Sequence, residues 1–92
     1  MSRPPNIIFI GKKPIMTYVN ATLTLLSNEP VVTIKARGKS ITIAVDVSQM
    51  IVKRLDAVGY KVSGVRIFSE RLTSQDGKER NVSTIEVDVS RP

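Results

Sequence analysis

The chain has 92 residues, of which 41% are hydrophobic, so one domain spanning residues 1–92 with one modest core is expected rather than wholesale disorder. It contains no cysteine and no histidine, which excludes disulfides, thiolate metal sites and the commonest general base; we expect no metal and no cofactor. The net charge of +6 instead predicts a polyanionic partner.

We expect no signal peptide at the start of the chain and no membrane span in its apolar stretches. The first residues are polar and rich in proline, so residues 1–5 are expected to be a flexible arm, with Arg3 either a weak electrostatic tether or part of a passive tail. The longest uncharged stretch, residues 14–28, is too short and too polar to cross a bilayer. We expect a cytoplasmic protein with no membrane partner.

The first half of the chain predicts a strand, a helix and a second strand. Residues 6–10 form a β-branched and aromatic run that Gly11 ends. Apolar residues then recur at helical spacing after Pro14, up to the helix-stopping residues 28–30. Residues 31–37 alternate between apolar and polar side chains, which is typical of a strand.

The second half predicts a longer helix and two more strands. Ser40 is a suitable N-cap for a helix that reaches about Ala57, and Gly59 is a natural terminator. Residues 62–70 and 82–89 alternate as strands, and Asp76-Gly77 between them is a hairpin turn signal. Because the residues beside this turn are polar, we expect the hairpin to extend beyond the globule as an arm.

The order β-α-β-α-β-β predicts an α/β fold, a two-layer sandwich of about four strands with both helices on one face. Two helical crossovers imply parallel, right-handed pairing of the first three strands, followed by an antiparallel hairpin.

The second helix carries two apolar stripes, although a surface helix of a monomer needs only one. The first consists of Ile41, Ala44, Val45, Ile51 and Leu55. The second consists of Ile43, Val47 and Met50. A homodimer partner is the simplest cover for the second stripe; one wide stripe buried within a single subunit is the alternative.

Most of the excess positive charge lies in the first half of the chain. Residues 1–45 hold six basic side chains and one acidic side chain, whereas residues 46–92 hold eight and seven. The basic residues at and after the ends of the first two strands should cluster at one sheet edge, with Lys35 just inside the second strand. They should lie beside the N-termini of both helices, in a geometry that favours phosphate. They are Lys12, Lys13, Lys35, Arg37 and Lys39. The alternative is that each is an ordinary solubilising residue.

The hairpin arm offers a second candidate contact. Arg71, Lys78 and Arg80 are accompanied by as many acidic residues, so the charge of the arm is near balance, and a narrow arm with arginines suits a minor groove. An ordinary mobile hairpin is the alternative. The chain has only four aromatic residues, with Phe9, Tyr18 and Phe68 expected in the core, so backbone recognition is favoured over base stacking.

Five segments together resemble the Alba family of archaeal chromatin proteins in order and spacing. They are Ile10-Gly11-Lys12-Lys13-Pro14 with Tyr18-Val19, Ile34-Lys35-Ala36-Arg37-Gly38, Ala44-Val45-Asp46, Thr73-Ser74-Gln75-Asp76-Gly77 and Val82-Ser83-Thr84-Ile85-Glu86. The resemblance covers nearly the whole chain. It implies the fold expected above and a dimer that coats and compacts double-stranded DNA with little sequence preference.

The resemblance also implies roles for individual residues. Lys12 and Lys13 would lie at the centre of the DNA-facing surface, with Lys12 as an acetylation site. The paired arms would bring Arg71, Lys78 and Arg80 near phosphate. Many family members carry phenylalanine where this chain has Leu55, at a contact between dimers, so Leu55 indicates either altered assembly with a paralogous chain or a plain core residue.

Two other classes of function stay open. RNA binding, as an RNA chaperone or ribonucleoprotein subunit, is the alternative to a chromosome-associated DNA coat. Catalysis is disfavoured because no set of nucleophile and base converges by spacing, and no small-molecule substrate is expected.

Overall fold

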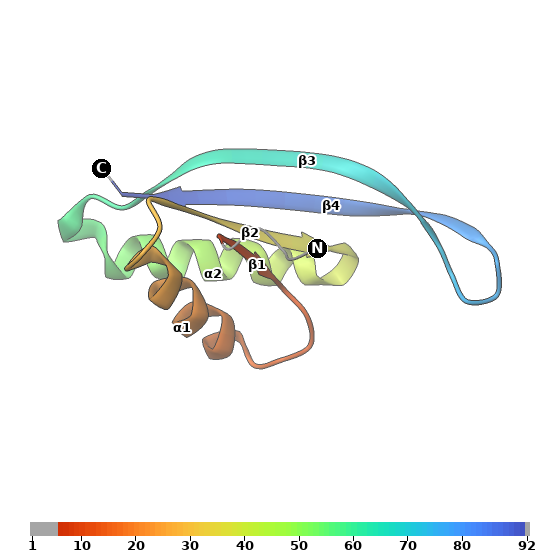
Figure 1. The fold of residues 1–92 in the computed structure, drawn as a ribbon, viewed down its shortest axis with the longest axis horizontal. Coiled ribbons are helices and arrows are strands. Elements are labelled where there is room, and N and C mark those ends of the chain that lie inside the picture. Colours follow the sequence, from red (N-terminus) through yellow and green to blue (C-terminus); the bar gives the residue numbers. More distant parts are fainter. Residues whose placement is uncertain (1–5, 92) are drawn as a thin grey trace.

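The computed structural model describes residues 6–91, so the predicted flexible arm at residues 1–5 lies outside the described part. The elements in chain order are β1 (Ile7–Phe9), α1 (Ile15–Leu26), β2 (Val31–Arg37), α2 (Ile41–Arg54), β3 (Lys61–Thr73) and β4 (Glu79–Ser90), with 3₁₀ turns at Gly38–Ser40 and Asp56–Val58. Both helices cover the same face of the sheet (Figure 1). The predicted α/β two-layer fold is therefore confirmed.

The strand order corrects one prediction. The sheet runs β1-β2-β4-β3, and β1 and β2 are its parallel pair. β4 lies between β2 and β3 and is antiparallel to both, so β3 does not pair with β2 as expected. The tight turn between β3 and β4 forces these two strands to be neighbours, and β4 then also satisfies the free edge of β2.

The hairpin extends beyond the rest of the sheet, as predicted. β2 ends where Arg37 pairs with Thr84, whereas the pairing of β3 with β4 continues to Thr73 and Glu79. The far half of the hairpin therefore pairs only with itself and forms a two-stranded arm (Figure 1). Hereafter "the arm" means residues 69–83.

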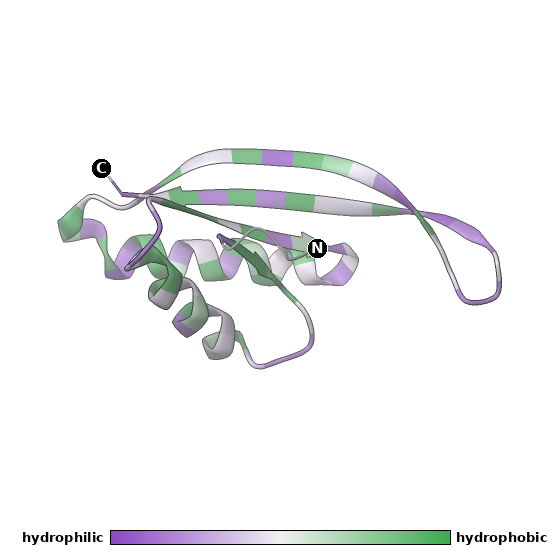
Figure 2. Ribbon diagram, viewed as in Figure 1, coloured by the Kyte–Doolittle hydropathy of each residue, from purple (hydrophilic) through white to green (hydrophobic). Residues whose placement is uncertain are grey.

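The core lies between the helices and one face of the sheet. Alternate residues of β2 and β4, including Ile34 and Val87, pack against Val19 of α1 and Ile51 of α2. Figure 2 shows the matching alternation of hydrophobic and hydrophilic residues along β3 and β4. Within residues 6–91 no helix covers the opposite face of the sheet (Figure 1), and that face carries polar residues of β2, β3 and β4 such as Lys35, Arg66 and Glu86.

Ser40 stands at the N-cap position of α2, as predicted. Ser40 makes no capping hydrogen bond through its side chain, because the backbone already turns helically from Gly38 in a 3₁₀ turn. The end is also close to expectation, since α2 stops at Arg54 and Gly59 adopts a left-handed conformation (φ 94°) after the second 3₁₀ turn. Within residues 6–91, neither helix is long and apolar enough to cross a membrane.

Candidate nucleic-acid interface

A short loop between β1 and α1 presents the two adjacent lysines. The hydroxyl oxygen of Tyr18, a buried residue in α1, accepts hydrogen bonds from the backbone N–H groups of Gly11 (2.8 Å) and Lys13 (2.9 Å). These bonds fix the loop against the helix, while the side chains of Lys12 and Lys13 are exposed. The two lysines are thus displayed from a loop with a defined backbone.

The end of β2 lies beside this loop. Gly38 turns the chain with a positive φ of 56°, a conformation that glycine tolerates best, and carries it into the 3₁₀ turn. A surface hollow of about 310 Å³ is lined from one side by Gly11 and Lys12 and from the other by Lys35 and Arg37. The structure therefore brings the basic residues that follow β1 and β2 to one edge; Lys39 is also exposed in the turn there.

Two of these predicted contact residues are already engaged by carboxylates. Arg37 donates to Glu70 through Nε (2.9 Å) and Nη2 (3.3 Å). Nζ of Lys35 lies 3.3 Å from Oε2 of Glu86 and 4.0 Å from Oε1 of Glu70. Both acidic partners come from the C-terminal hairpin, and the sequence analysis did not connect them with the cluster.

A second ion-pair group continues across the helix-free face. Arg66 donates to Glu86 through Nε and to Asp88 through both terminal nitrogens, each at 2.8 Å, and Thr33 also donates to Asp88. With Lys35, Arg37 and Glu70, three cations here face three carboxylates. This face is therefore close to electroneutral, whereas within residues 6–91 no ion pair involves Lys12, Lys13 or Lys39 in the turns at its edge.

The ion pairs set the protonation of these groups. The hydrogen bonds from Arg37 lower the pKa of Glu70 to about 2, with Thr84 contributing, and Glu70 in turn raises the pKa of Arg37. Arg66 lowers the pKa of both Glu86 and Asp88. All three carboxylates are consequently ionised across the physiological pH range.

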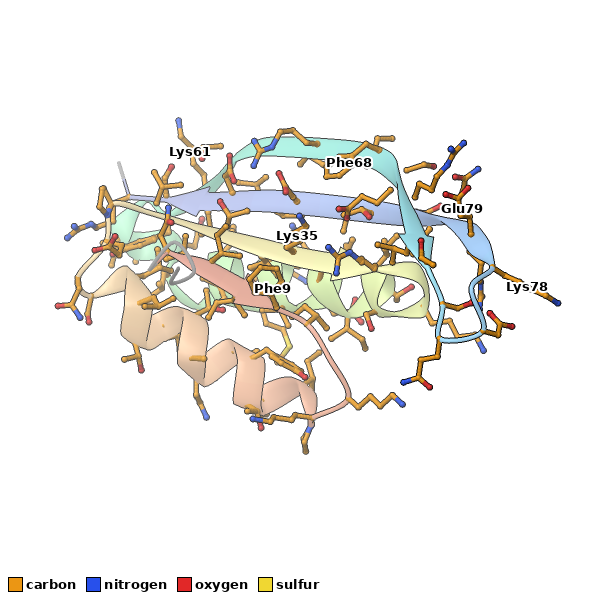
Figure 3. All side chains as sticks on the ribbon, turned by 45° about the vertical axis from the view of Figure 1, so that its right-hand side comes forward. Phe9, Lys35, Lys61, Phe68, Lys78 and Glu79 are labelled. Carbon is orange, nitrogen blue, oxygen red and sulfur yellow. The ribbon has the colours of Figure 1, made fainter. Side chains whose placement is uncertain are left out.

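Phe68 also belongs to the helix-free face, contrary to its expected place in the core. Its side chain is exposed, and Nζ of Lys35 lies 5.7 Å from the centre of its ring. Figure 3 shows Phe9, Lys35 and Phe68, which come from three different strands. Phe9 is only partly buried, so it too is not a core residue in the strict sense.

The basic residues of the arm are exposed. Nη1 of Arg71 lies 3.7 Å from Oε2 of Glu79 in a solvent-exposed pair, and Lys78 and Arg80 are exposed beside the turn (Figure 3). The turn itself is tied by Asp76, which accepts from Ser74 and from the N–H of Lys78. The arm thus carries cations at a distance from those of the loop cluster.

The predicted partner-contact residues of α2 fall in different environments. Val47 is fully buried (0% exposed) within the chain itself, so it is a core residue and not a surface for a partner. Ile43 and Leu55 are partly buried against the same core, and Met50 is exposed. The assignment of Val47 was wrong because the phase in which a helix docks on its sheet is set by the tertiary packing.

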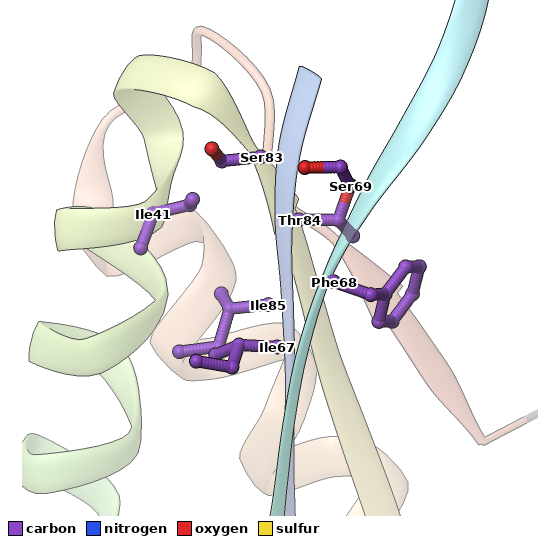
Figure 4. A pocket seen from close by; sticks show the side chains of 7 residues that line it. All are labelled: Ile41, Ile67, Phe68, Ser69, Ser83, Thr84 and Ile85. Carbon is purple, nitrogen blue, oxygen red and sulfur yellow. The ribbon is translucent and has the colours of Figure 1, made fainter. Parts of the chain in front are cut away.

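A different apolar surface is exposed beside α2. Ile67 of β3 is 77% exposed and Val65 is 56% exposed, although both lie on the helix-covered side of the sheet. Ile67 lines a hollow with Ile41 and Ile85 (Figure 4). Val45, which was expected in the core, is also exposed. β3 is the edge strand of the sheet, and these side chains are left largely exposed there.

Comparison with known proteins agrees with this architecture. A family model described as Alba matches residues 6–69. The protein named DNA/RNA-binding protein Alba from Nitrosopumilus maritimus is 57% identical over 84 residues, which cover 91% of this chain and 88% of the relative. The protein of the same name from Methanocella arvoryzae is 40% identical over 88 residues, which cover 95% of this chain and 91% of the relative.

A solved structure extends the agreement to three dimensions. The structure described as Alba from Thermoplasma volcanium has a TM-score of 0.84 at 42% sequence identity and covers 94% of this chain and 100% of that chain. The family model extends from β1 into β3, and the relatives align over most of both chains. This protein belongs to the Alba family.

Proposed function

We propose that the protein binds double-stranded DNA as a dimer, without sequence preference, and coats and compacts it as a chromosome-associated protein of the cytoplasm. The observation that carries the proposal is the display of Lys12, Lys13 and Lys39 at one edge of the fold, next to Lys35 and Arg37. Relatives with high sequence identity are named for DNA and RNA binding. No catalytic role is proposed.

Backbone contacts account best for such binding. Lysine and arginine neutralise phosphates and release the counterions condensed on the duplex, so affinity depends steeply on salt and weakly on sequence. The arm supplies Arg71, Lys78 and Arg80 for a groove at the side of this contact. Acetylation of Lys12 would remove one cation and weaken binding.

The dimer is proposed to form through the uncovered apolar surface made by Ile41, Val45, Val65 and Ile67, with Met50 at its margin. Contiguous apolar side chains at a sheet edge are typical of an interaction site. A second copy of the chain would place a second basic cluster on the same duplex. A paralogous chain is the alternative partner. Ile43 and Leu55 would contribute only at the edges of such contacts, Leu55 between dimers.

RNA is the alternative ligand. Two observations support it: the relatives are named for RNA binding as well as DNA binding, and the exposed ring of Phe68 is available for stacking on a base. The purified protein is titrated with random-sequence DNA duplexes and a structured RNA at several salt concentrations. Equal, salt-sensitive affinity for unrelated duplexes is the expected result. Weak DNA binding beside tight, structure-dependent RNA binding would transfer the protein to the RNA-binding role.

A further inference from the structure

Glu70 occupies a site with the donors that a phosphate oxygen prefers. Its Oε1 accepts from Nε of Arg37 (2.9 Å) and from the hydroxyl of Thr84 (2.9 Å), and Nζ of Lys35 lies 4.0 Å from the same oxygen. Its Oε2 accepts from Nη2 of Arg37. The carboxylate is thus held by a guanidinium fork, a hydroxyl and an ammonium group. We refer to Arg37, Thr84 and Lys35 as the oxyanion cradle.

The cradle is a built feature rather than a chance meeting of surface chains. Thr84 is 1% exposed, and its contact with Glu70 is shorter than its 3.4 Å contact with the carbonyl of Val82. Arginine forks bind carboxylate and phosphate with the same two-point geometry, and a hydroxyl donates equally well to either. The donor set therefore suits a phosphodiester as well as it suits Glu70.

The cradle lies between the two candidate contact regions, the lysine loop and the arm. Arg37 lines the same hollow as Lys12, at the end of β2. Thr84 of β4 pairs with Arg37, the last residue of β2, and Glu70 stands where the arm begins on β3. The cradle therefore lies beside the lysine loop and at the start of the arm, where a nucleic-acid backbone that contacts both can reach it.

We propose that the oxyanion cradle is a phosphodiester-binding site that Glu70 fills in the free protein, so that Glu70 is an internal competitor of nucleic-acid phosphate. This inference rests on the proposed nucleic-acid binding. Glu70 lies on the edge strand and its side chain is 26% accessible, so rotation about its own side-chain bonds suffices to vacate the site. Lys35 keeps Glu86 as a partner when Glu70 leaves.

Displacement of Glu70 has an energetic consequence. Binding must break the pair of Arg37 with Glu70, and the released carboxylate takes up a cation, which opposes the counterion release from the duplex. Glu70 therefore weakens binding and reduces its salt dependence without being a contact residue. A neutral side chain at this position should release Arg37 for phosphate.

The test compares Glu70→Gln and Glu70→Ala with Asp56→Asn. Asp56 is exposed in the 3₁₀ turn at the other end of α2, and its replacement changes the net charge equally. Affinity for a random-sequence DNA duplex is measured against salt. Both Glu70 variants should bind about 3- to 10-fold more tightly with a log–log salt slope steeper by up to about one unit, whereas Asp56→Asn should gain less than about twofold.

Arg37→Gln shows whether the gain passes through the cradle. In that background, Glu70→Gln should add no more than Asp56→Asn does. The inference is overturned if the Glu70 variants match Asp56→Asn, if they weaken binding, or if their gain persists without Arg37. If the unmodified protein binds neither duplex nor RNA at low salt, the proposed function fails. If it binds tightly and the Glu70 variants bind no better than Asp56→Asn, only the inference about Glu70 fails.

Discussion

The hydroxyl oxygen of Tyr18 and the backbone N–H of Lys13 are joined by a 2.9 Å hydrogen bond that ties the lysine loop to the first helix. The same oxygen accepts a hydrogen bond from the backbone N–H of Gly11. A Cβ atom added at Gly11 would lie only 3.2 Å from this oxygen. One side chain thus shapes the loop and consumes two of its N–H groups. In the proposed interface, the affinity of Lys12 and Lys13 for phosphate would depend in part on this ordering.

Replacing Tyr18 by phenylalanine is therefore expected to destabilise both the fold and the site. The change leaves two part-buried N–H groups without their acceptor, which should cost about 1–3 kcal/mol in the free energy of unfolding. Denaturant unfolding measures this loss. Tyr60→Phe is the control, since the hydroxyl of Tyr60 makes no hydrogen bond within residues 6–91, and equal effects of the two variants would contradict the role of Tyr18.

Lys12→Ala/Lys13→Ala tests the proposed centre of the interface. If each lysine neutralises one phosphate, the log–log salt slope should fall in magnitude by about 0.9 for each lost contact, with weaker binding at low salt. Lys61→Ala is the single-charge control at the far end of β3 (Figure 3), with Lys12→Ala alone as its match. Full affinity in the double variant would remove these lysines from the interface.

Lys12→Gln imitates the charge change of acetylation. We expect it to weaken duplex binding by about the same factor as Lys12→Ala, because both remove one cation from the exposed loop. Lys12→Arg retains the charge and should bind nearly as the unmodified protein does. Affinity measured at one salt concentration distinguishes the three; a Lys12→Gln protein with unchanged affinity would contradict regulation through this charge.

The position of the lysine loop could be predicted from the sequence, whereas the acidic residues near it could not. Lys12 follows β1 and Arg37 ends β2, and the order of elements places those strand ends at one edge. Glu70 is 33 residues from Arg37, and Asp88 is 55 residues from Thr33. Such pairs depend on strand order and register, and the prediction that the third strand pairs with the second placed them wrongly.

The sequence pattern of α2 likewise did not predict which of its apolar residues are buried. The pattern in α2 predicted excess apolar surface, and the structure has exposed apolar residues there. The buried stripe, however, combines Ala44 and Ile51 with Val47 from the other predicted stripe, and Val45 is exposed. Amphipathic spacing gives the width of an apolar face but not the angle at which the helix docks. Ile67 could not be assigned to a surface without the position of β3 at the sheet edge.

Ile67→Glu tests the proposed dimer. A carboxylate in the centre of a buried apolar contact is strongly unfavourable, so the variant should sediment at the 10.1 kDa mass of one chain, while the unmodified protein sediments at twice that mass. Met16→Glu replaces an exposed apolar residue on α1 and should leave the dimer intact. Sedimentation equilibrium provides the masses. A dimer that persists in Ile67→Glu would place the interface elsewhere.

Acid unfolding should reveal the ion pair of Glu70. Arg37 lowers the pKa of Glu70 from its ordinary value of 4.5 to about 2 in the folded chain. The unfolded chain therefore binds the proton more readily, so the stabilisation is fully present above pH 4.5 and is lost as the pH falls towards 2. The free energy of unfolding should accordingly decline less steeply over this range in Glu70→Gln than in the unmodified protein.

Two comparisons make this pH prediction specific. Arg37→Gln removes the cause of the lowered pKa and should flatten the same part of the profile. Some acid dependence should remain in both variants, because Arg66 still lowers the pKa of Asp88 and Glu86. Urea unfolding at closely spaced pH values gives the slopes. If the profiles of Glu70→Gln and the unmodified protein run parallel from pH 4.5 to 2, the ion pair between Arg37 and Glu70 does not persist in solution, and Arg37 is then free for phosphate without any competitor.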